Sequence, residues 1–190
     1  MKYTITSIFI ILVLQLSAQE NLPYREIPDY PEEYSAESVC ARMIDGLGFR
    51  YYWATEGLRL EDLEYKPNED ARTSRETLEH IHALSIVVIS SMQQESQKAV
   101  DVSGYSFEEL RKATLMNLSE ASEILLSGNV KASELVIQFE GSDTTFPFWH
   151  QLNGPIADAI WHVGQVVSFR RSSGNPFNSK ANVFTGKLRD

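Results

Sequence analysis

The sequence predicts an all-α protein built as a four-helix bundle over residues 35–174. Four stretches carry apolar residues at spacings of three and four, which is the period of one face of an α-helix. Two of these stretches open with a capping box, a Ser or Thr followed three residues later by a Glu. We expect the helices in up-down order, with a long connection before the last one.

The first helix is predicted from residue 36 to about residue 57, with Ser35 as its N-cap. Gly46 and Gly48 each weaken this helix by about 1 kcal/mol relative to alanine, and close packing is one explanation for their presence. Residues 58–71 are expected to form a loop. The apolar positions of the helix keep a regular spacing: Val39, Met43, Leu47, Tyr51, Ala54 and Leu58.

The second helix is predicted to begin at the capping box of Thr73 and Glu76 and to end near Gln94. His80 lies on the apolar side of this helix, so its imidazole is expected to face inward. His82 lies about 200° from His80 around the helix axis. The two histidines therefore cannot address the same point.

The third helix is predicted to begin at the capping box of Ser106 and Glu109 and to end at Gly128, because glycine commonly terminates a helix. Residues 134–140 then alternate between apolar and polar side chains. This pattern predicts a short extended piece before the last helix.

The fourth helix has two possible starts. It begins either near Pro147, with a kink at Pro155, or at Asn153, with Pro155 inside its first turn. It is expected to end near Gly174. The tail, residues 175–190, is expected to be pinned on the bundle by Phe177, Val183 and Phe184.

The N-terminal residues have the pattern of a secretory signal peptide. Lys2 precedes an apolar run at residues 8–14, and small residues follow up to Ala18. We expect residues 1–18 to be cleaved, residues 19–34 to form an extended lead-in, and the protein to be periplasmic or secreted. An uncleaved membrane anchor is the weaker alternative, because a spanning helix needs roughly 20 apolar residues.

Composition narrows the possible partners. The formal charge of −9 becomes −10 when Lys2 is removed, which argues against binding the phosphate backbone of nucleic acids. The expected partner is a small molecule of unknown identity, with a homodimer as a further possibility. Cys40 is the only cysteine, and its place among helical core positions favours a buried structural residue over a nucleophile.

Asp158 and His162 are the strongest candidates for a site. They are four residues apart on the fourth helix, so they project about 40° apart and can share one metal ion. A solvated helix face is the alternative explanation. Trp161 and Phe169 nearby favour a cleft instead, because aromatic side chains are unusual on a purely polar face.

Two longer segments resemble the DinB-like superfamily, also called DinB/YfiT-like metalloenzymes. They are LRLEDLEYKPNEDARTSRETLEHI, leading into the second helix, and DAIWHVGQVVSFRRSSGNP in the fourth. The likeness runs from about residue 36 to residue 176. In that family a histidine early in the second helix and an HxxxH pair in the fourth bind a divalent metal. His80 and His162 match these ligands, and Asp158 stands where the family often has histidine.

The resemblance implies a divalent metal, Zn²⁺, Ni²⁺, Fe²⁺ or Mn²⁺, held by His80, Asp158 and His162. Three protein ligands with an open position suit a catalytic site, so we expect a metal-dependent hydrolase or nucleophilic transferase. Relatives include thiol-dependent S-transferases and isomerases, a substrate class that export disfavours. The alternatives are a non-catalytic metal- or ligand-binding bundle, and a degenerate member in which Asp158 only hydrogen-bonds His162.

Several other polar residues are candidates for roles near this site. Gln165, one turn after His162, is a candidate to orient it or to bind substrate. Glu76 is a candidate base, although its capping role already accounts for it. His150 reaches the site only if the helix is unbroken. Arg170 and Arg171 could bind an anion, but the helix dipole already favours cations there.

Overall fold

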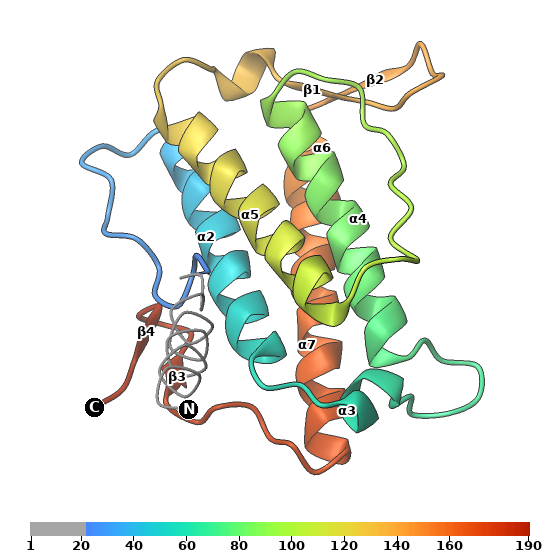
Figure 1. Ribbon diagram of the computed structural model, residues 1–190. Coiled ribbons are helices and arrows are strands. Elements are labelled where there is room, and N and C mark those ends of the chain that lie inside the picture. The colour runs from blue at the N-terminus through green and yellow to red at the C-terminus, as the bar shows by residue number, and fades with distance from the viewer. Residues whose placement is uncertain (1–21) are drawn as a thin grey trace, which may run out of the picture.

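The computed structural model describes residues 22–190 (Figure 1). The predicted signal peptide, residues 1–18, lies outside the described residues. The described chain is mostly helical, as expected, and it also contains two small two-stranded sheets. No helix within residues 22–190 is long and apolar enough to cross a membrane.

Four long helices surround the main core. They are α2 (Ala36–Thr55), α4 (Ser74–Met92), α5 (Phe107–Leu126) and α7 (Ala157–Ser172). Going around the core, α2 packs on α5, α5 on α4, α4 on α7, and α7 on α2. The interior consists of fully buried apolar side chains from all four helices, among them Ile44, Leu78, Ile81, Leu115, Leu118 and Val166.

The direction of the helices differs from the predicted up-down order. Successive parts of α4 contact the start, middle and later part of α5 in the same order, as in the pairs Arg75 with Tyr105 just before α5, His82 with Thr114, and Gln93 just after α4 with Glu120. The helices α4 and α5 are therefore parallel, and the connection over residues 93–106 runs back along the molecule (Figure 1). Parallel neighbours need such a crossover, which hydrophobic spacing within each helix does not reveal.

The helix starts follow the predicted caps. Ser35, Thr73 and Ser106 each accept a hydrogen bond from the backbone N–H three residues later. A capping box is complete at all three starts. These bonds satisfy N–H groups that the first turn of a helix leaves without partners, which explains why the starts were predictable.

The segments between the long helices hold more structure than expected. A short helix, α3 (Leu60–Glu64), interrupts the predicted loop. The extended piece is strand β1 (Val136–Gln138), which follows a 3₁₀ turn (Ala132–Glu134) and pairs antiparallel with β2 (Thr145–Pro147). The last helix starts early and is broken, with α6 (Trp149–Gln151) followed by a π-helical turn (Leu152–Ile156) that contains Pro155.

The tail is only partly pinned as predicted. Phe177 packs beside Phe49 and Trp53, but Val183 is half exposed and Phe184 is 96% exposed. The prediction for Val183 and Phe184 is wrong, because the tail forms a small hairpin of β3 (Ala181–Asn182) and β4 (Lys187–Leu188) that turns other residues inward. Those residues are Ala181 and Leu188.

Cys40 is buried on α2, as predicted, with only 3% of its surface exposed. Burial raises the pKa of its thiol to about 12. The thiolate is the reactive form of cysteine, so this residue is inert and structural.

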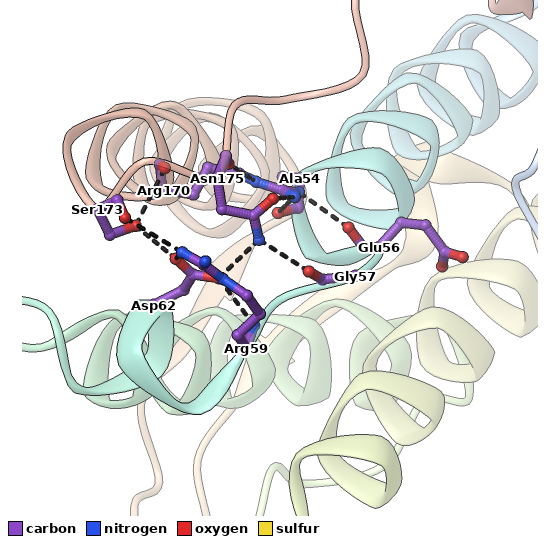
Figure 2. A network of polar contacts seen from close by, with 8 residues as sticks. All are labelled: Ala54, Glu56, Gly57, Arg59, Asp62, Arg170, Ser173 and Asn175. Atoms are coloured by element: carbon purple, nitrogen blue, oxygen red, sulfur yellow. Dashed lines mark hydrogen bonds and ion pairs between the residues drawn. The ribbon is translucent and has the colours of Figure 1, made fainter.

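A polar cluster joins the ends of α2, α3 and α7 (Figure 2). Arg59 binds both carboxylate oxygens of the fully buried Asp62, and Ser173 and Asn175 also donate to that carboxylate. Burial by itself raises the pKa of the Asp62 carboxyl, but these hydrogen bonds outweigh it and hold that pKa well below its usual range. Arg170 donates to the backbone carbonyl oxygens of residues 53, 54 and 56.

Gly48 allows the lead-in segment to dock on α2. The ring of Tyr24 lies against Gly48, and a Cβ atom at this position would overlap three of its ring atoms. The Tyr24 hydroxyl donates to Asp45 one turn earlier on the helix. At Gly46, by contrast, a Cβ would meet only the flexible end of Arg50. Close packing thus explains Gly48.

Gly48→Ala is expected to lower the free energy of unfolding, even though alanine is the better helix former. The helix gain of about 1 kcal/mol is smaller than an overpacking cost of about 1–3 kcal/mol. Thermal and urea unfolding of the purified variant measure the difference. Gly46→Ala is the matched control and should be neutral or stabilising; equal behaviour of the two variants contradicts the packing role.

Asp62→Ala is expected to lower the free energy of unfolding at pH 7 by about 2–3 kcal/mol, because the buried carboxylate loses its charge-assisted hydrogen bonds while Arg59 stays half exposed to water. The folded pKa of Asp62 lies below the unfolded value of about 3.9, so its stabilisation is complete above that pH and is lost as the pH falls further. The gap between wild type and variant should therefore narrow below about pH 4.

Urea titrations from pH 7 down to pH 2 measure this gap. Glu61→Ala, which removes an exposed carboxylate from the same short helix, serves as the control and should leave stability unchanged. A gap that stays constant across this pH range would show that Asp62 does not act through its charge.

Candidate functional site

His80 of α4 meets Asp158 and His162 of α7. The Nε2 atom of His80 lies 3.3 Å from one carboxylate oxygen of Asp158, and the Nε2 atom of His162 lies 3.4 Å from the other. The two imidazole rings are nearly perpendicular, with centroids 4.7 Å apart. One ligand atom from each residue falls within 4.8 Å of the other two, so the three form a possible metal-binding triad.

The antiparallel packing of α4 against α7 creates this meeting point. The buried side chain of Gln151 donates to the backbone carbonyl of Val87 at 3.0 Å. Seven residues back along α4 stands His80, and seven residues forward from Gln151 stands Asp158. The two contacts follow one another along the seam in antiparallel order, on either side of the π-helical turn at residues 152–156.

Gln165 orients the imidazole of His162. Its side-chain carbonyl oxygen lies 2.6 Å from Nδ1 of His162, one turn away on the same helix. A carbonyl oxygen can only accept, so Nδ1 carries the proton in this contact. The Nε2 atom of a neutral His162 is then left with its lone pair directed toward Asp158 and His80.

The triad lies at the seam between α4 and α7 and stays open to solvent. The side chains of His80, Asp158 and His162 are 31%, 38% and 16% exposed. The true solvent face of α7 carries Trp161, Gly164 and Ser168 instead. The alternative of a solvated helix face therefore does not fit His162. The aromatic argument for a cleft does not hold for Trp161, which points to solvent and does not line a cleft with His162.

The remaining candidates have other partners. Glu76 accepts from the backbone N–H of Thr73 at 2.7 Å, and the hydrogen bonds of this cap lower the pKa of its carboxyl. The ring of His150 lies on Phe146 of β2, 5.7 Å between centroids. Arg170 is buried in the cluster of Figure 2, so it is not available for an anionic substrate.

His82 lies apart from the triad, as the helix geometry predicts. It is buried, and its Nδ1 atom lies 3.0 Å from the hydroxyl oxygen of Thr114 on α5. Burial lowers the pKa of its imidazole, which favours a neutral structural histidine.

Two features of the site carried no signal in the sequence. Asp158 contacts both histidines, one oxygen each, and not His162 alone. An apolar hollow lies elsewhere, between the start of α2 and α6, and none of the triad residues lines it. Val39 and Met43, which line it, show the same helical spacing as core residues.

The arrangement offers two imidazole nitrogens and a carboxylate, the donor set of many sites for Zn²⁺ and similar ions. No protein-family model matches the chain, and no curated protein matches its sequence.

The Gln165 contact predicts one tautomer of His162. In metal-free protein at a pH where His162 is neutral, we expect the proton on Nδ1, because the amide oxygen 2.6 Å from Nδ1 is a nearer acceptor than the Asp158 oxygen 3.4 Å from Nε2. Nitrogen-15 NMR of the histidine rings distinguishes the two tautomers. Gln165→Leu should shift the population toward the Nε2-protonated form, whereas an unchanged spectrum would show that Gln165 does not orient the ring.

Proposed function

We infer that this chain is an exported, DinB-like four-helix-bundle protein that binds a divalent metal through His80, Asp158 and His162, and that it acts on a small molecule as a metal-dependent hydrolase or nucleophilic transferase. One observation carries the inference. His80 on α4 and Asp158 on α7 are 78 positions apart in the sequence, yet their donor atoms and that of His162 lie within 4.8 Å of one another.

The donors present fit such an ion. Two imidazoles and one carboxylate suit Zn²⁺, and also Fe²⁺, Mn²⁺ or Ni²⁺. Three protein donors leave at least one coordination position for water or substrate. When bound, such an ion lowers the pKa of a bound water and polarises a carbonyl group, which is the chemistry of hydrolysis and nucleophilic transfer.

The surrounding residues support this role. Gln165 sets the tautomer in which Nε2 of His162 can bind a cation, and such outer partners commonly change metal affinity 10- to 100-fold. Behind the triad, Ala159, Val163 and Val166 are buried and hold α7 in place. The partial exposure of all three donors leaves a path from solvent.

The family and export parts of the proposal rest on the sequence. The segments leading into α4 and through α7 carry the resemblance, and the packing of four long helices is consistent with it. The N-terminal pattern supports export to the periplasm or the outside of the cell. The net charge of −9 supports a small-molecule partner over nucleic acid.

A second candidate is a non-catalytic metal-binding module. It is favoured because the hollow between the start of α2 and α6 lies away from the triad, and none of the three donors lines it. Substitution with Co²⁺ separates the candidates. Azide should change the visible spectrum if a coordination position is open, and it should have no effect if the ion is fully ligated.

Protein purified without a His tag is expected to carry about one divalent ion per chain after incubation with metal and removal of excess, because three donors define one site. Asp158→Ala and His162→Ala should each lose this ion. Elemental analysis and calorimetric titration measure the loss.

His150→Ala is the matched control, since it removes an exposed histidine that lies on Phe146. It should retain the wild-type metal content. An equal, trace amount of metal in the wild type and in all three variants would contradict the metal proposal.

A further inference from the structure

A hollow of about 670 Å³ lies between the start of α2 and α6. Its walls come from the residues just before α2, the first two turns of α2, the 3₁₀ turn after α5, and the chain around α6. These segments lie at one end of the helical core in Figure 1. The triad residues do not line it, so it is a separate feature.

The hollow has a closed floor and open walls. Cys40, Ala132 and Phe148 are buried beneath it, whereas Val39 and Trp149 along its rim are at least half exposed. Val39 and Met43 stand one turn apart on α2, and within residues 22–190 no element covers them. The feature is therefore a concave apolar site and not a flat surface patch.

No charged residue contributes to the lining. Twelve residues surround the hollow, and none of them is Asp, Glu, Lys, Arg or His. A charged ligand would lose its hydration without gaining an ionic partner, which is costly in an apolar environment. An uncharged ligand pays no such penalty, so the lining selects for one.

Size favours a small molecule over a second protein chain. The volume falls within the range of about 300–1,000 Å³ that is usual for small-molecule pockets. Stable protein interfaces use roughly 20–30 residues on each side, far more than the twelve found here. The hollow is thus large enough for a ligand and too small for a dimer interface.

We propose that this hollow is a binding site for an uncharged, hydrophobic small molecule, held between Val39 and Met43 of α2 and Phe148, Trp149 and Leu152 around α6. The site is independent of the proposed metal function, because no metal donor contributes to it. The hydroxyl groups in the lining, from Tyr34, Ser35 and Ser133, allow the ligand to carry a polar group.

The test uses N-phenyl-1-naphthylamine, an uncharged probe that fluoresces in apolar surroundings. We expect saturable binding of one probe per chain. Met43→Trp and Val39→Trp place a larger ring in the hollow and should each weaken binding about tenfold or more. Met116→Trp changes a similarly exposed methionine on α5, outside the hollow, and should bind like the wild type.

Circular dichroism checks that each variant is folded. Two variants fill the hollow, so that the test can still be made if one of them does not fold. The anionic analogue 1-anilinonaphthalene-8-sulfonate should bind at least about tenfold more weakly, because no cation lines the site. Unchanged probe binding in both filling variants, or equal binding of the anion, would overturn the proposal.

A second copy of the chain is the other possible occupant of the hollow. Analytical sedimentation measures whether the protein is a monomer or a dimer and so distinguishes it from a small molecule. A dimer that both filling variants dissociate would replace the small-molecule proposal. Asp158→Ala should keep full probe binding, so a failure of the metal proposal leaves this test intact.

Discussion

Arg170 is the contact on which the position of the last helix depends. Its guanidinium group donates to the carbonyl oxygens of Trp53, Ala54 and Glu56 at the end of α2. Carbonyl groups in the last turn of a helix have no partner within that helix, and burying them unpaired is costly. A side chain of α7 therefore completes α2, and α7 cannot slide along α2 without breaking these bonds.

That constraint extends along α7 to the candidate site. A helix rises 1.5 Å per residue, so fixing Arg170 fixes the height of Asp158 about 18 Å away. The bond from Gln151 to Val87 fixes the other end against α4. Between these two anchors, the buried side chains Ala159, Val163 and Val166 set the rotation of α7, so His162 and Asp158 have one height and one rotation relative to His80. The triad is therefore a consequence of helix packing and needs no flexible loop to assemble it.

The parts of the structure that were predictable are those with local causes. The caps at Ser35, Thr73 and Ser106 are contacts within one turn, so the helix starts could be identified from spacing. The triad was predictable because Asp158 and His162 are four residues apart and because the resemblance pointed to His80. The parallel run of α4 and α5, the helix around Asp62 and the exposed Phe184 depend on contacts between distant segments, which periodicity does not record.

The break before α7 keeps His150 away from the triad. In an unbroken helix, His150 would lie about two turns before Asp158, roughly 12 Å along the axis, which is too far to share an ion but close enough to line the approach to the donors. Pro155 has no backbone N–H, so the helix cannot continue regularly through it, and the π-helical turn over residues 152–156 redirects α6. His150 lies on Phe146 instead. The approach to the triad is therefore left to His80, Asp158 and His162 themselves, the three donors on which the metal proposal rests.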